Sequence, residues 1–246
     1  MGCAVTNAAI VLAGGAGTRL HASENKVYLP VAGRPLLAWS LEAFDRCHAI
    51  DRIVLVIRDA DTQRANDMLA AHPVRKLDTI VPGGSTRHES EHAGIEALAP
   101  AIERGEIGLV CVHDGARPFI RQALIEEIMQ TAAAHGGAVP SLLVETPMLV
   151  RAGTGTANPP EPVSTHDLRR VQTPQAFRAR PLLHAHRQAT ADGLQGMDTT
   201  TPVTRYTDLV VKVVNGDADN IKVTFVEDLF AVEELAAHWQ DSDEHR

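Results

Sequence analysis

Glycines and cations follow one another near the start of the chain in a pattern that suits a polyanion. Gly14, Gly15 and Gly17 follow an apolar stretch, Arg19 comes two residues after them, and Lys26 stands seven residues further on. Glycines let backbone N–H groups approach an anion closely, and such groups form a nest for phosphate oxygens. Two cations beside the nest suit a polyanion whose charge grows during a reaction. The segment therefore predicts a binding site for a nucleoside triphosphate.

The glycine loop departs from two common phosphate-binding patterns. A P-loop needs a lysine directly after its last glycine, and none stands there. A dinucleotide fingerprint needs a third glycine where Leu20 stands. The pattern from Leu12 to Arg19, followed by a lysine, instead resembles nucleotidyltransferases that join a nucleotide to a sugar or polyol phosphate. A plain strand-to-helix turn is the alternative, but it gives no reason for Arg19 and Lys26.

A second glycine segment opens a predicted helix. Gly83 and Gly84 allow close backbone approach, and Ser90 in the first helical turn offers a hydroxyl and an N–H group. This arrangement suits the edge of a base or a ribose. The alternative is an ordinary helix start that is capped by Ser85.

Two charged residues follow later apolar stretches. Asp114 ends one of them, and a carboxylate beside a triphosphate is a natural Mg²⁺ ligand because hard cations take oxygen ligands. The alternative for Asp114 is a simple ion pair with Arg117. Lys222 follows the last predicted strand and would add a third cation, unless it is an ordinary solvated lysine.

Apolar runs alternate with helical patterns along the chain. The predicted strands are Ala8–Leu12, Arg52–Ile57, Leu77–Val81, Ile107–His113, Gly137–Leu143 and Leu209–Val214. The predicted helices are Pro35–Arg46, Ala60–Ala71, Arg87–Leu98, Gln122–His135, Pro181–Asp192 and Val226–His238. This order predicts an α/β fold with a mostly parallel twisted sheet flanked by helices. In such sheets ligands bind beyond the carboxyl ends of the strands, where the polar motifs fall.

One stretch breaks the alternation. Thr146–Pro162 holds two glycines and four prolines and has no helical period. A loop this long in a compact domain is usually functional. We interpret it as part of an excursion over about residues 145–172, within a single domain that spans 1–246, rather than as a linker.

The composition indicates which partners the protein is expected to lack and in which cellular compartment it is expected to act. A net charge of −8 argues against a general nucleic-acid binder. No apolar run approaches the roughly 20 residues that cross a bilayer, and no signal peptide is recognisable, so no membrane partner is expected. Three widely spaced cysteines without a Cys-x-x-Cys motif favour reduced thiols and a cytoplasmic location.

The chain also contains twelve histidines. His88 and His92 are four residues apart, and His184 and His186 are two apart, but neither pair has a suitable third ligand nearby in the sequence. We expect these histidines to be solvated or to cap helices rather than to bind zinc.

Taken in order, the motifs extend over most of the chain. They read Leu-Ala-Gly-Gly-x-Gly-Thr-Arg at 12–19, Lys26, Gly-Gly-x-x-Arg at 83–87, His-Asp-x-x-Arg-Pro-Phe at 113–119, Gln-Thr-Pro-Gln-x-Phe at 172–177 and Asn-Ile-Lys-Val-Thr at 220–224. This set resembles the methylerythritol phosphate cytidylyltransferases and, equally, the related ribitol-5-phosphate cytidylyltransferases. The resemblance covers roughly residues 6–238.

The resemblance implies a Rossmann-like nucleotidyltransferase domain whose β-arm, the excursion at 145–172, embraces a second subunit in a homodimer. It implies attack of a polyol phosphate, most of all 2-C-methyl-D-erythritol 4-phosphate in isoprenoid biosynthesis, on the α-phosphorus of CTP. The alternative acceptor is ribitol 5-phosphate, another polyol phosphate or a phosphonate. The reaction releases pyrophosphate and uses Mg²⁺.

The resemblance also assigns roles to individual residues. The catalytic cations would be Arg19, Lys26 and Lys222. Cytidine and its phosphates would be cradled by Ala13, Gly14, Gly15, Gly84, Ser90 and Gly115. The acceptor would lie near Arg117, Thr146, Thr165 and Asp198. The metal would be held by Asp114, with Asp219 as its companion and Asp217 as the alternative companion.

The chain departs from this family mainly on the acceptor side. Thr165 stands where the family usually places an arginine of the partner's arm, with Arg169 and Arg170 nearby. The family's Thr-Asp-(Asp/Glu)-Ala reads Met-Asp-Thr-Thr from 197, so only Asp198 carries over. Its Pro-Lys-Gln reads Asn-Lys-Val from 25. A catalytically inactive nucleotide-binding relative is therefore the alternative of another class, although a mere binding module would not need Arg19, Lys26, Asp114 and Lys222 together.

Overall fold

The computed structural model describes residues 5–15, 25–144, 148–150, 161–163, 168–194 and 198–243, with the backbone alone at 148–150, 161–163 and 240–243. Its largest element is an eight-stranded sheet. The strands are β1 (Thr6–Leu12), β4 (Arg52–Ile57), β5 (Leu77–Pro82), β6 (Ile107–Asp114), β7 (Gly136–Leu143), β10 (Arg169–Val171), β11 (Gln175–Arg178) and β12 (Val210–Asn215). Their order is β10-β7-β11-β6-β1-β4-β5, and β12 pairs with β7.

The sheet is mixed but mostly parallel, which confirms the predicted fold class. β1 runs parallel to β4 and β6, β5 runs parallel to β4, and β12 runs parallel to β7. β11 runs antiparallel to both β6 and β7, and β10 antiparallel to β7. The register pairs Leu12 with Asp114, so the first glycine loop and the motif that contains Asp114 leave the sheet side by side.

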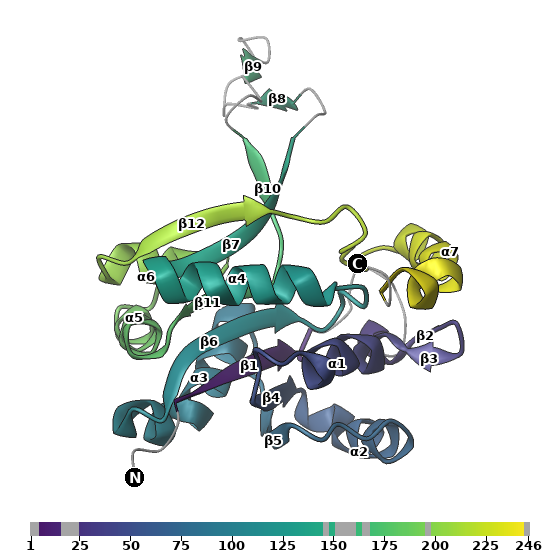
Figure 1. Ribbon diagram of the computed structural model, residues 1–246, viewed down its shortest axis with the longest axis horizontal. Coiled ribbons are helices and arrows are strands. Elements are labelled where there is room, and N and C mark those ends of the chain that lie inside the picture. The colour runs from purple at the N-terminus through teal and green to yellow at the C-terminus, as the bar shows by residue number, and fades with distance from the viewer. Residues whose placement is uncertain are drawn as a thin grey trace.

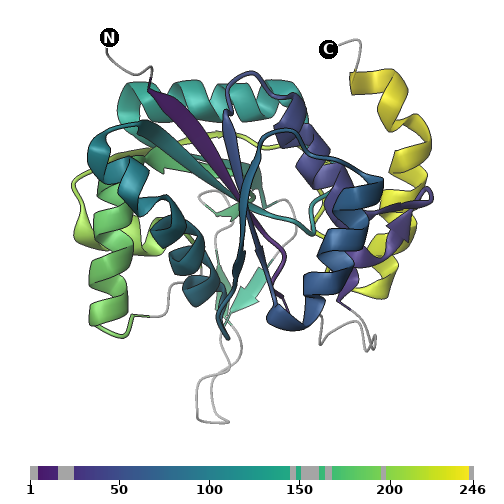
Figure 2. The ribbon, with the colours of Figure 1, turned by 90° about the horizontal axis from the view of Figure 1, so that it is seen from below.

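Helices cover both faces of the sheet (Figure 2). Ala9 and Val11 of β1 pack with α1 (Leu36–Arg46), α2 (Thr62–Ala71) and α4 (Gln122–His135). Ala8 and Ile10, which point the other way because side chains alternate along a strand, pack with α3 (Arg87–Arg104), α5 (Ala179–Ala191) and α6 (Thr200–Tyr206). The sheet therefore has a buried aliphatic core on each side.

A smaller core joins the C-terminal helix to the body. α7 (Val226–Asp243) packs beside β2 (Pro30–Val31), which pairs with β3 (Arg34–Pro35) in a two-stranded sheet. Its aromatic centre contains Trp39, Phe119 and Trp239. This core fixes the segment between β12 and α7.

The described part of the excursion at 145–172 contains short strands. β8 (Met148–Val150) and β9 (Glu161–Val163) pair antiparallel in a sheet of their own. Figure 1 shows them beyond the end of the β7–β10 ladder, away from the main body. A protruding arm is thus present, while its role in dimerisation stays a prediction. Among the described helices, none is long and apolar enough to cross a membrane.

Candidate active site

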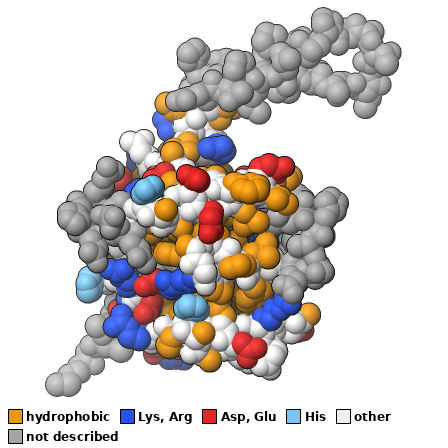
Figure 3. Space-filling view, turned by 90° about the vertical axis from the view of Figure 1, so that its right-hand side faces the viewer, with side chains coloured by type: hydrophobic (Ala, Val, Ile, Leu, Met, Phe, Trp, Pro, Cys, Tyr) orange, Lys and Arg blue, Asp and Glu red, His pale blue; other side chains and the backbone are white. Residues whose placement is uncertain are grey.

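A cleft of about 340 Å³ opens where the parallel strands end. β1 lies between β4 and β6 in the sheet, and the chain after β1 leads to β4. This reversal of strand order is the position at which open α/β sheets bind ligands. Figure 3 looks onto the right-hand side of Figure 1; hydrophobic side chains gather at the centre of this view, and Lys and Arg side chains lie beside acidic ones at its lower left.

The cleft collects most of the residues that the sequence singled out. Predicted residues that line it are Gly14, Gly15, Lys26, Gly84, Ser90, Asp114 and Lys222. Ala13 is buried directly before them. Arg19, Thr146 and Thr165 lie outside the described residues. The predicted roles of all these residues remain predictions, but their convergence from distant segments of the chain is a finding.

Asp114 is the carboxylate at the centre of the charged lining. Lys222 Nζ lies 2.6 Å from Asp114 Oδ2, and the Arg87 guanidinium lies 3.3 Å from Oδ1. Burial alone would raise the pKa of Asp114, but Arg87 and Lys222 outweigh it and hold the pKa well below its usual range. Asp114 is therefore an ionised acceptor at neutral pH. Among the described residues, its ion-pair partners are these two cations, not Arg117 as the alternative had it.

Asp114 is also fixed through its backbone. Its N–H donates to Thr173 Oγ1 at 3.0 Å, and that hydroxyl lies 3.2 Å from Nδ1 of the buried His113. His113 Nε2 lies 3.2 Å from the Arg117 carbonyl. A neutral imidazole that donates from Nε2 and accepts at Nδ1 satisfies both contacts. Burial lowers the pKa of His113 to about 4, so this form persists at neutral pH.

Buried hydrogen bonds hold the segment that carries Lys26 in place. It begins the short 3₁₀ helix η2 (Lys26–Tyr28), not a loop, and Asn25 caps that helix. The buried Asn25 amide donates to the Ala13 carbonyl and to Asp61 Oδ2, both at 2.8 Å. Arg58 donates two hydrogen bonds, of 2.7 and 2.8 Å, to the same Asp61 carboxylate. Lys26 is thus tied to the end of β1 and to the end of β4.

The second glycine segment approaches the cleft closely. A Cβ on Gly84 would lie 2.2 Å from Glu89 Cβ, so no larger residue fits there without a backbone shift. Thr86, not Ser85, caps α3 by accepting from the Glu89 N–H at 3.1 Å. Glu89 in turn accepts from the Ser85 N–H at 2.7 Å. These bonds place Ser90 at the cleft wall.

Two predicted residues have supporting positions instead of lining the cleft. Arg117 is buried, and its Nη1 donates to the Asn220 carbonyl at 2.7 Å, so it steadies the segment that carries Lys222. Gly115 packs under the cleft, where an added Cβ would meet Leu37 Cδ1 at 2.8 Å. The described cleft lining includes neither of them.

The prediction of Asp219 as a companion metal ligand needs correction. Asp219 Oδ2 pairs with Arg121 Nη2 at 2.6 Å and lines a different concavity together with Asp217. The nearby arginine neutralises it, so the structure does not bring it to Asp114. Asp198 likewise lies outside the described lining, where its carboxylate accepts from the Thr201 N–H at 3.1 Å at the start of α6.

Two cations of the cleft were given no role from the sequence. Arg58 follows β4, and Arg87 is the first residue of α3; both line the cleft. The signal for Arg58 was its place directly after a predicted strand, at the same sheet edge as the other motifs. Arg87 was part of the Gly-Gly-x-x-Arg motif, but its contact with Asp114 depends on the pairing of distant segments.

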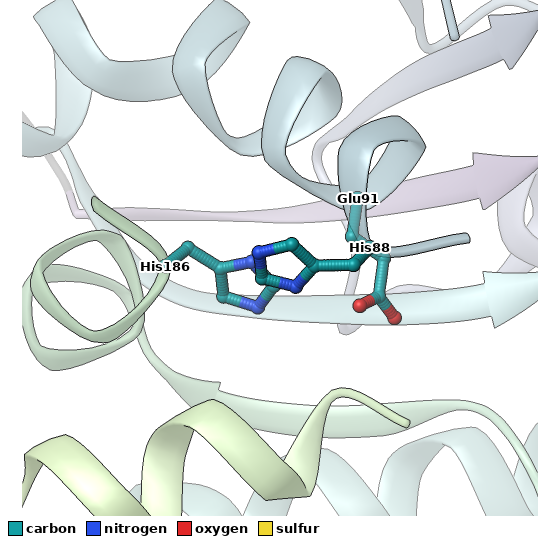
Figure 4. Close-up of side chains that lie close together, drawn as sticks. All are labelled: His88, Glu91 and His186. Atoms are coloured by element: carbon teal, nitrogen blue, oxygen red, sulfur yellow. The ribbon is translucent and has the colours of Figure 1, made fainter. Parts of the chain in front are cut away.

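The expectation that the histidines are solvated is wrong for His88 and His186. Both are buried, and their rings stack at 5.1 Å between centroids. Figure 4 shows the stacked pair with Glu91 beside it. Burial lowers the pKa of His186 to about 3 and raises that of Glu91 to about 7, against the opposing effects of Arg87 and Thr199 on Glu91.

Comparisons with known proteins agree with the motifs. Residues 7–237 match the family IspD: 2-C-methyl-D-erythritol 4-phosphate cytidylyltransferase. A relative of that name from Geobacillus kaustophilus (strain HTA426) is 37% identical over 229 residues, which is 93% of this chain and 96% of the relative. A second relative of that name, from Clostridium novyi (strain NT), is 35% identical over 224 residues, 91% of this chain and 93% of its own.

Solved structures give the same result. The crystal structure of 4-diphosphocytidyl-2C-methyl-D-erythritol synthase from Anaerococcus prevotii DSM 20548 superposes with a TM-score of 0.80 at 26% identity and covers 95% of this chain and 96% of that one. That of 2-C-methyl-D-erythritol 4-phosphate cytidylyltransferase from Thermus thermophilus superposes with a TM-score of 0.70 at 29% identity, over 95% and 99%. The chain therefore belongs to the 2-C-methyl-D-erythritol 4-phosphate cytidylyltransferase family.

Proposed function

We propose that this enzyme transfers CMP from CTP to 2-C-methyl-D-erythritol 4-phosphate and releases pyrophosphate, in the supply of isoprenoid precursors. One observation carries the proposal beyond family membership. The described lining of the cleft contains four cationic side chains and a single carboxylate, together with residues of two glycine segments. Such a lining suits a triphosphate whose charge is redistributed as a P–O bond breaks.

For this reaction the protein must position the two substrates and neutralise phosphate charge. A phosphate oxygen of the acceptor attacks the α-phosphorus of CTP, and the bond between that phosphorus and the pyrophosphate oxygen breaks. The attacking phosphate is already ionised at neutral pH, so no general base is required. Lys26 and Lys222, with Arg19 from outside the described residues, neutralise the crowded charge at the α-phosphorus. Backbone N–H groups near Gly14, Gly15 and Gly84 hold the nucleotide together with Ser90.

Asp114 fits a Mg²⁺ ion. It is ionised, it lines the cleft, and Mg²⁺ usually takes one or two carboxylates together with substrate phosphates. When bound, the ion would neutralise phosphate charge and help to orient the triphosphate. Lys222 and Arg87 would then exchange part of their contact with Asp114 for contact with the phosphates.

We further propose that two copies pair through the β8–β9 arm, in the cytoplasm. The protruding position of the arm supports pairing (Figure 1), and the buried free thiols of Cys47 and Cys111 suit a reducing compartment. Light scattering of the purified protein tests the pairing: the expected mass is twice the 26.5 kDa of one chain. A mass of one chain would contradict it.

The decisive test is pyrophosphate release with CTP, Mg²⁺ and a panel of polyol phosphates. We expect turnover with 2-C-methyl-D-erythritol 4-phosphate and little with ribitol 5-phosphate. Faster turnover of ribitol 5-phosphate, or of another acceptor, would overturn the assigned acceptor but not the chemistry. CTP binding without pyrophosphate release for any acceptor would overturn the enzyme itself.

A further inference from the structure

Three buried side chains with metal-ligating atoms meet between α3 and α5. His88 and Glu91 lie three residues apart on α3 and so share a face of that helix. His186 faces them from α5 (Figure 4). Their ligand atoms all lie within 4.8 Å of one another, and each of the three residues is at most 3% exposed. The cluster is therefore closed to bulk solvent and separate from the described lining of the cleft.

The imidazoles of this cluster lack hydrogen-bond partners. Both ring nitrogens of His186 and Nδ1 of His88 are buried and have no partner among the described residues. His88 Nε2 makes only a long contact, at 3.5 Å, with Thr190 Oγ1. Buried polar atoms are nearly always satisfied in folded proteins, so unpaired ones need an explanation. An uncharged imidazole that lacks a hydrogen bond still offers a lone pair to a metal ion.

We propose that His88, Glu91 and His186 bind one divalent metal ion such as Zn²⁺. Two imidazoles and one carboxylate form the ligand set of known His₂Glu zinc sites. Thr199 Oγ1 donates to Glu91 Oε1 at 2.5 Å. A hydrogen bond of this kind orients a ligating carboxylate and strengthens metal binding.

Binding rearranges the cluster. Zinc bonds of about 2.1 Å set tetrahedral ligand atoms about 3.4 Å apart, so the three side chains draw together. The two rings are nearly parallel, with 10° between their planes, whereas the lone pairs lie in those planes. One imidazole therefore turns about its Cβ–Cγ bond, and the stack opens when the ion binds.

Arg87 connects this cluster to the cleft. Its Nη1 pairs with Glu91, while Nε and Nη2 lie 3.3 Å from Asp114 Oδ1. A metal ion that is bound to Glu91 competes with Arg87 for that carboxylate. Arg87 then loses its contact with Glu91 and keeps its contact with Asp114. The ion is thus expected to change the contacts of Asp114 without entering the cleft.

The test is a titration of chelator-treated protein with Co²⁺, followed by its visible absorption, with Mg²⁺ in excess throughout. Mg²⁺ occupies oxygen sites such as Asp114 and leaves imidazoles to Co²⁺. His186→Phe keeps a ring for the stack but removes both nitrogens, and Glu91→Gln removes the carboxylate charge. His184→Phe is the matched control, because this histidine is exposed on the same helix.

We expect one Co²⁺ per chain in the wild type and in His184→Phe, displaced by Zn²⁺. The affinity should fall at least tenfold in both His186→Phe and Glu91→Gln, with circular dichroism to confirm folding. If His186→Phe does not fold, Glu91→Gln decides. Wild-type affinity in a folded variant, or no stoichiometric uptake by the wild type, would overturn the proposal.

Discussion

At the scale of single residues, Asp114 joins three distant segments. Lys222 bonds one of its oxygens and Arg87 approaches the other, so β6, α3 and the segment after β12 meet at one carboxylate. Opposite charges attract more strongly in a partly buried site than in water. The cations are thereby held in place before a nucleotide arrives, and a triphosphate competes with Asp114 for them.

The first prediction concerns Asp114→Asn. The amide keeps the shape of the side chain but removes the charge that pairs with Lys222 and would hold Mg²⁺. We expect kcat/KM for pyrophosphate release to fall at least about 100-fold, as for the loss of other electrostatic groups. Calorimetric CTP binding without Mg²⁺ should be unchanged or tighter, because a negative charge beside the phosphates is gone. Weaker binding under those conditions would contradict this account.

The second prediction concerns Lys222→Met, which keeps the aliphatic stem and removes the ammonium. We expect kcat to fall about 100- to 1,000-fold, because the lost cation acts on charge that develops during the reaction. Lys212→Met, on the exposed part of β12, is the control and should keep full activity. Steady-state kinetics of the two variants, Lys222→Met and Lys212→Met, measure the difference in kcat. Equal losses in both variants would show a general charge effect instead.

Residue types and spacing were enough to predict several residues that line the cleft. Gly14, Lys26, Asp114 and Lys222 were all predicted, because each follows an apolar run and such runs end at one sheet edge. Asp219 was misplaced because sequence proximity to Lys222 said nothing about Arg121, which lies 98 residues away along the chain and binds it. Ion pairs between distant segments cannot be read from spacing.

At the scale of elements, the segment that carries Lys26 is held by a buried clamp. Asn25 bonds the end of β1 and Asp61, and Asp61 bonds Arg58 at the end of β4. Burial raises the pKa of Asp61, but the bonds from Arg58 and Asn25 outweigh it and lower the pKa overall. We infer that Asn25 is a positioning residue for Lys26.

The third prediction follows from this clamp. Asn25→Ala leaves Asp61 and the Ala13 carbonyl each short of a donor, so stability should fall by about 1–3 kcal/mol. If Asn25 positions Lys26, kcat should also fall about tenfold or more, with a smaller change in the KM for CTP.

Asp45→Asn is the matched control for that variant. Asp45 is also buried and accepts from Arg75 Nε at 3.1 Å and from the Lys76 N–H at 2.8 Å, outside the described cleft lining. It should lose stability, measured by urea unfolding, and keep kcat. An unchanged kcat in Asn25→Ala would refute the positioning role.

Periodicity found the long elements and missed the short ones. α4 has the predicted bounds, and β4 has them as well. β10 and β11 have three and four residues, too few for a period, and they exist because they pair with β6 and β7. α3 runs on to Arg104, past the predicted end at Leu98, and stops where Gly105 adopts φ +79°.

At the scale of the whole molecule, buried histidines link stability to pH. Burial lowers the pKa of His113 to about 4, below its unfolded value of about 6.5. Between these values the unfolded chain binds a proton that the folded chain does not. The stability from neutral His113 is therefore complete above about pH 6.5 and is lost as the pH falls toward 4.

The fourth prediction isolates this effect with His113→Asn. At pH 7 we expect the variant to be less stable than the wild type by about 2 kcal/mol, because buried hydrogen bonds are lost. The difference should shrink as the pH is lowered to 4.5, since the variant lacks the titrating group. Urea unfolding at several pH values measures it. Glu91 titrates in both proteins and cancels, and a difference that grows on acidification would contradict the assignment.

The ion pair between Lys222 and Asp114 also bears on synthesis. The two residues are 108 positions apart, and Lys222 is the later of the two to be synthesised. Domains made on the ribosome fold as they emerge, from the N-terminus onward. A nascent chain can thus pair β1 with β4 and β6 while Lys222 is still inside the exit tunnel. The charge balance at Asp114 is completed only after Lys222 has emerged, so the cleft becomes competent later than the pairing of these strands.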